Sequence, residues 1–129
     1  MAGIQLSSFF VGLFALVQVP LTIVVGYRRA QTGIQFFDGG DAVLLRRMRA
    51  HANFTETVPI TLVAMAAAEY CGASRGLLVA TGVSLAVGRA LHYATLVRSG
   101  FGIGRAIGMV LTLLAMATLG GWLLWRSAW

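Results

Sequence analysis

The residues best suited to chemistry form one polar stripe at the start of an apolar segment. Arg46, Arg49, Asn53 and Glu56 are spaced by three, four and three positions, so a helix would present them on one face. Charged groups need a partner or water when they enter an apolar medium. The stripe therefore predicts a polar binding site or, through Glu56, an ion pair with a buried cation. These two interpretations do not exclude each other.

A second polar group falls inside a later apolar run. Arg89 and His92 lie three positions apart and share a helical face, which Tyr93 nearly joins. An arginine in the middle of a membrane span costs about 2.5–3.5 kcal/mol on insertion scales. One alternative is therefore a structural ion pair between Glu56 and Arg89. Two histidines on different helices and a single cysteine give a weak metal signal, and no metal site is predicted.

The elements that must position these residues are membrane helices. The 129 residues are 58% hydrophobic and 11% charged, with a mean hydropathy of +0.82, which is more apolar surface than a soluble domain of this size can bury. Each of four apolar runs has about 18–23 residues and can cross a ~30 Å hydrocarbon core as a helix. These runs cover residues 5–27, 54–71, 76–97 and 103–125.

Short links between the runs imply that neighbouring helices are antiparallel. The second helix should begin upstream of its apolar run, near Asp41, which follows two glycines and suits an N-cap. We therefore predict an all-α membrane protein, with residues 1–129 forming a single four-transmembrane-helix bundle.

The charge of the chain is concentrated at the predicted membrane edges. The net charge is +6, and every basic residue other than histidine is an arginine. Seven arginines flank the first and third loops, namely Arg28, Arg29, Arg46, Arg47, Arg49, Arg98 and Arg105, whereas Arg75 and Arg126 lie on the other side. The positive-inside rule then places the first and third loops in the cytoplasm and both termini outside. This distribution gives no reason to expect a nucleic-acid partner.

The motifs resemble those of the MAPEG family, the membrane-associated proteins of eicosanoid and glutathione metabolism. "RAHANFTETVP" at residues 49–59 resembles the second-helix signature, in which Arg is followed by Asn, Glu and a nearby Pro. "GRALH" at residues 88–92, with Arg105 sixteen positions after Arg89, resembles the prostaglandin E synthase branch. The short chain is similar to bacterial members, which indicates a bacterial inner membrane protein.

This resemblance implies a homotrimer that binds glutathione as co-substrate between neighbouring subunits at the cytoplasmic side. The positions that match the family's glutathione-binding residues are Arg28, Arg49, Asn53, Glu56, His92 and Arg105. The chain departs from many members at Thr57 and Leu96, where the family often has tyrosine. Tyr93 could replace one of these aromatic contacts.

The predicted function is a glutathione S-transferase or peroxidase that acts on a lipophilic small molecule supplied by the lipid bilayer. Arg105 is the predicted catalytic residue because a cation there could stabilise the glutathione thiolate. An anchor to lipid phosphate is the alternative role for Arg105. Alternatives for the whole protein are a non-enzymatic membrane protein that binds glutathione or anionic lipid, and a small multidrug exporter. The exporter is disfavoured because such exporters have an essential glutamate in their first helix, whereas residues 5–27 contain no acidic residue.

Overall fold

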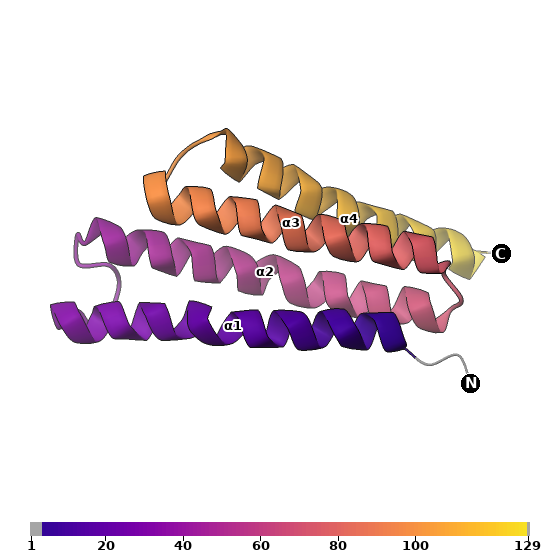
Figure 1. Cartoon of the computed structure of the whole chain (residues 1–129), viewed down its shortest axis with the longest axis horizontal. Coiled ribbons are helices and arrows are strands. Elements are labelled where there is room, and N and C mark those ends of the chain that lie inside the picture. Colours follow the sequence, from indigo (N-terminus) through magenta and orange to yellow (C-terminus); the bar gives the residue numbers. More distant parts are fainter. Residues whose placement is uncertain (1–3, 129) are drawn as a thin grey trace.

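Four antiparallel helices make up the fold in the computed structural model, which describes residues 4–128. The helices are α1 (Gln5–Thr32), α2 (Ala42–Tyr70), α3 (Arg75–Ser99) and α4 (Ile103–Ala128). Figure 1 shows them side by side along one axis, with the α1–α2 loop and the α3–α4 loop at the same end of the bundle. The predicted all-α four-helix architecture is confirmed.

The helix ends follow local capping rules. The Asp41 side chain accepts a hydrogen bond from the backbone N–H of Leu44 at 2.6 Å, which confirms Asp41 as the N-cap of α2. Gly33 and Gly100 follow α1 and α3 with φ values of 70° and 75°, a left-handed conformation that glycine adopts without steric cost. These capping residues mark the ends of the helices, so the first loop covers residues 33–41 and the third loop covers residues 100–102.

Three of the four described helices are long and apolar enough to cross a membrane, namely α1, α3 and α4. The exception is α2, whose first half carries Arg46, Arg47 and Arg49 and whose remainder still holds Glu56 and Glu69. Its 29 residues extend over about 44 Å, whereas the hydrocarbon core is ~30 Å thick. The polar half of α2 therefore belongs to the membrane edge, as the sequence predicted.

Helices α3 and α4 approach each other closely because two glycines face each other. A Cβ atom on Gly88 would lie 2.7 Å from the carbonyl oxygen of Gly108, so any larger side chain would force the two backbones apart. Small residues at such a crossing are typical of membrane helix pairs. The apolar core includes buried residues of all four helices, such as Phe14, Met65, Leu85 and Leu119.

A carboxylate from α2 completes the first turn of α1. The Glu69 carboxylate accepts hydrogen bonds from the backbone N–H groups of Leu6 and Ser7 at 2.9 and 2.7 Å. These donors have no partner within their own helix, and a carboxylate at a helix N-terminus is also favoured by the helix dipole. Glu69 therefore joins the start of α1 to the end of α2.

Candidate functional site

The Arg89 guanidinium is the polar centre of the bundle. Only 6% of this residue is exposed, and its side chain reaches both α2 and α4. Its Nε donates to the Thr112 hydroxyl at 2.9 Å, and its other nitrogens donate to the Asn53 side-chain oxygen and to the Gly108 carbonyl. These acceptors are neutral, so Arg89 joins α2, α3 and α4 without a carboxylate.

The predicted ion pair between Glu56 and Arg89 is wrong within the single chain. Glu56 is exposed, and the ion pair found among residues 4–128 joins Arg28 to Asp41 instead. The reason is the rotation of α2 about its axis. Asn53 and Thr57 are four residues apart and both face Arg89, whereas Glu56 is turned away by about 100° from Thr57 on a helix of 3.6 residues per turn.

A cavity of about 390 Å³ lies between α2, α3 and the start of α4, and we call it the polar cavity after three polar side chains in a lining that is otherwise mostly apolar. It collects three of the predicted site residues, Asn53, His92 and Arg105, which come from three different helices. His92 is buried, and the half-buried Arg105 donates from Nη1 to the Gly100 carbonyl at 3.4 Å. An amide, an imidazole and a guanidinium thus converge on one space with no carboxylate in its lining.

The remaining predicted site residues do not line this cavity. Tyr93 is adjacent to His92 in the chain, but it faces a separate apolar cavity of about 410 Å³ between α1, α2 and α3. The expectation that Tyr93 could replace an aromatic contact of the polar site is therefore not supported in the single chain. Arg49 and Glu56 are exposed on the outer side of α2, where another molecule could reach them.

Arg28 belongs to the end of α1 and is paired with Asp41. Its Nη2 and Nε donate to the two carboxylate oxygens of Asp41 at 2.7 and 3.2 Å. The hydrogen bond from Arg28 holds the pKa of the Asp41 carboxyl below its usual range, and the Leu44 N–H acts in the same direction. Arg28 thus fixes the first loop, and its predicted role in glutathione binding stays a prediction.

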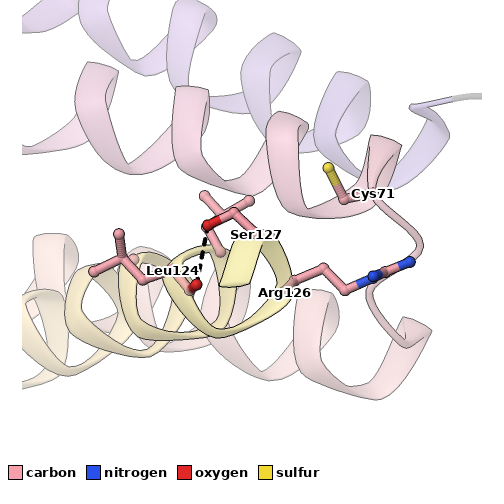
Figure 2. A pocket seen from close by; sticks show the side chains of 6 residues that line it. Cys71, Leu124, Arg126 and Ser127 are labelled. Atoms are coloured by element: carbon pink, nitrogen blue, oxygen red, sulfur yellow. Dashed lines mark hydrogen bonds between the residues drawn. The ribbon is translucent and has the colours of Figure 1, made fainter. Parts of the chain in front are cut away.

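A larger cavity lies at the opposite end of the bundle. It measures about 650 Å³ and is lined by Cys71, Arg126, Ser127 and apolar residues of α4. Figure 2 shows the Ser127 hydroxyl turned back to the Leu124 carbonyl of its own helix. The exposed Cys71 thiol has no histidine or carboxylate beside it in this lining. No cluster of metal-ligating side chains occurs among residues 4–128.

Several polar contacts escaped the sequence reasoning. Thr57 and Thr112 serve as acceptors for Arg89, and a threonine inside an apolar run gives no signal of that role. Gln18 lies in the middle of the first apolar run, yet its side chain contacts the His51 ring at 2.9 Å. A polar residue at mid-span is itself the signal that could have pointed to a partner on a neighbouring helix.

The fold and the cavity of Asn53, His92 and Arg105 define a four-helix membrane protein with a polar site at one membrane edge. Residues 7–125 match the MAPEG family. Two relatives, the "Inner membrane protein YecN" of Escherichia coli K12 and that of Escherichia coli O6:H1, are each 32% identical over 89 residues, which is 69% of this chain and 68% of theirs. No solved structure matches this chain. The chain belongs to the MAPEG family.

Proposed function

We propose that this protein binds glutathione at the Asn53–His92–Arg105 cavity and transfers it to a lipophilic electrophile, or uses it to reduce a lipophilic hydroperoxide. The membership of the chain in the MAPEG family supports this proposal. The name of the relatives supports a location in the bacterial inner membrane. We further propose that the first and third loops face the cytoplasm, since arginines gather there.

The observation that carries the proposal is the composition of the polar cavity. Its lining includes the Arg105 guanidinium and no carboxylate, so it favours a ligand that can place a thiolate beside Arg105. Glutathione has two carboxylates, one ammonium group and a thiol. The cavity volume of about 390 Å³ falls within the ~300–1,000 Å³ that is usual for small-molecule sites. Asn53 can both donate to and accept from an amide of the peptide.

The exposed part of the α2 stripe supports contact with another subunit, and the number of three subunits in our proposal comes from the family resemblance. Arg49 and Glu56 point out of the single chain, although a bare carboxylate on an exposed helix face is costly near an apolar medium. In an oligomer, Glu56 of one subunit could hold the ammonium group of a glutathione bound to the next subunit. Arg49 could then pair with a glutathione carboxylate through two parallel hydrogen bonds.

Arg105 would act on the thiol. A free thiol has a pKa of about 8.5, and lowering this pKa by about two units corresponds to roughly 2.7 kcal/mol, which one cation in a dehydrated cavity can supply. In a transfer reaction, the thiolate sulfur attacks the electrophilic carbon, a C–S bond forms, and the leaving group departs with its electron pair. In a peroxidase reaction, two glutathione molecules are oxidised to the disulfide while the hydroperoxide becomes an alcohol and water.

The test compares the wild-type protein with Arg105→Ala. Glutathione binding is measured by calorimetry, thiolate formation by ultraviolet absorbance, and turnover with chlorodinitrobenzene. We expect binding within a few-fold of wild type, a weaker thiolate signal near neutral pH, and turnover about ten- to a hundredfold lower, which equals roughly 1.4–2.7 kcal/mol. Arg105→Lys should recover part of the loss, because a single sulfur anion needs charge more than fork geometry.

The outcomes separate the alternatives. Normal assembly with full thiolate formation and turnover in Arg105→Ala would leave Arg105 as a lipid anchor and remove the catalytic assignment. Glutathione binding by the wild-type protein without any turnover would favour the non-enzymatic alternative. A correctly assembled wild-type protein that binds no glutathione would overturn the proposal as a whole.

A further inference from the structure

The first loop presents two adjacent phenylalanines to its surroundings. Phe36 and Phe37 are each 82% exposed, and we call these two residues the aromatic tip. Single exposed apolar residues are ordinary, whereas neighbouring large apolar side chains at a loop end indicate contact with an apolar phase or partner. The tip lies outside the cavities described above, so its exposure needs a separate explanation.

The backbone of the first loop holds the tip in a fixed arrangement. Nη1 of Arg29 donates to the carbonyls of Ile34, Gln35 and Phe37, each at 3.1 Å. Phe37 has a φ of 55°, a left-handed conformation that is rare for a bulky side chain and persists only when its surroundings enforce it. The tip is therefore formed before any partner arrives, so contact does not require the loop to become ordered.

The length of the helices places the tip at the membrane surface. The 28 residues of α1 extend over about 42 Å, which matches the ~40–45 Å thickness of a bilayer with its headgroups. In Figure 1 the α1–α2 loop projects beyond the α3–α4 loop along the bundle axis. The tip thus reaches the headgroup level, while the start of α4 and its polar cavity lie closer to the membrane centre.

The charge around the tip is complementary to lipid phosphate. The residues near the first loop carry an excess of positive charge, with five arginines against two aspartates, namely Arg28, Arg29, Arg46, Arg47, Arg49, Asp38 and Asp41. Segments that lie at the membrane interface are enriched in both basic and aromatic residues. An anionic lipid surface satisfies both features at once.

We propose that the aromatic tip is a preformed anchor that inserts Phe36 and Phe37 among the headgroups of an anionic lipid bilayer. Arg46 and Arg47, which each donate to a single backbone carbonyl within the chain, contact the lipid phosphates. This anchor fixes the depth of the α1–α2 end, and with it the depth of the polar cavity between α2, α3 and α4. The inference concerns the lipid contact and does not depend on glutathione chemistry.

A fluorescent label on the tip tests the proposal. Because Cys71 is the single cysteine of the chain, the Cys71→Ser background permits one labelled cysteine at Phe36→Cys. The matched control is Gln35→Cys, which places the same label on the neighbouring exposed residue. Both proteins carry the nitrobenzoxadiazole label and are reconstituted into phosphatidylcholine–phosphatidylglycerol vesicles, with iodide added on both sides of the membrane.

We expect the label at position 36 to emit at shorter wavelength than the label at position 35. It should be quenched by lipids with a spin label high in the acyl chain, and its iodide quenching should be several-fold weaker. Equal access of iodide to both positions in vesicles would overturn the proposal, because the tip would then face water. Shielding from iodide without quenching by the spin-labelled lipids would also overturn it, because the tip would then face another protein. Should Phe36→Cys fail to fold, Phe36→Trp provides a second measurement. Brominated lipids must quench the emission that this tryptophan adds, and unquenched emission would also overturn the proposal.

Discussion

Replacing one acceptor of Arg89 gives a direct measure of the polar centre. The Thr112 hydroxyl is fully buried and accepts from Arg89 Nε at 2.9 Å, and Thr112→Val keeps the shape while removing the acceptor. Hydrogen bonds to charged groups contribute about 1.5–3 kcal/mol in soluble proteins, whereas pairs within membranes average ~0.6 and reach ~1.7 kcal/mol. Because Arg89 is buried and cannot turn to water, we expect a loss of about 1–2 kcal/mol.

The assay is reversible unfolding in mixed micelles with increasing dodecyl sulfate, followed by circular dichroism. Thr118→Val is the matched control, because Thr118 is exposed on the same helix, and it should change the unfolding free energy by less than about 0.5 kcal/mol. Arg89→Met should cost little, since it removes an insertion penalty of about 2.5–3.5 kcal/mol together with the hydrogen bonds. In the Arg89→Met background, Thr112→Val should then have almost no effect.

Two results would refute this reasoning. The first is an equal cost of Thr112→Val with and without Arg89, since coupling is what a double-mutant cycle measures. The second is a large destabilisation by Glu56→Gln that Arg89→Met rescues, because that result would restore the ion pair which the exposed position of Glu56 argues against.

Further predictions concern assembly, helix contact and pH. Light scattering in mild detergent should give three chains of 13.7 kDa after subtraction of bound detergent, and a monomer or dimer would remove the intersubunit site. Gly108→Ala should lower the unfolding free energy by about 1–3 kcal/mol, since its Cβ would meet the Gly88 carbonyl; Gly120→Ala, where a Cβ meets nothing, should not, and equal effects would contradict the close contact. The pKa of Asp41 is lowered in the folded protein. The ionised Asp41 carboxylate therefore stabilises the fold fully above the usual aspartate pKa of about 3.9, and this stabilisation is lost as the pH falls through the lower pKa of the folded protein. Asp41→Asn should therefore remove part of the acid sensitivity in unfolding measured against pH, and an unchanged acid profile would contradict this.

The sequence predicted the elements better than their rotations. Apolar run lengths and the Asp41 cap define the helices, whereas the family resemblance, and not the spacing of polar residues, named Asn53, His92 and Arg105 as members of one site. The partner of Arg89 could not be predicted, because it depends on how α2 and α3 rotate about their own axes. That rotation is set by packing such as the Gly88 contact with α4, which involves residues distant in sequence. A shift of one residue exchanges Thr57 for Glu56 as the group that faces Arg89.

The Glu69 cap has a consequence for the order of membrane insertion. The acceptor for the backbone N–H groups of Leu6 and Ser7 lies more than 60 positions later in the chain. During synthesis, α1 emerges first, and its leading turn keeps unsatisfied donors until the far end of α2 has arrived. Water or headgroups must satisfy those donors in the meantime, because the hydrocarbon core offers no acceptor. The helical hairpin of α1 and α2 is thus the smallest unit in which the first helix is complete.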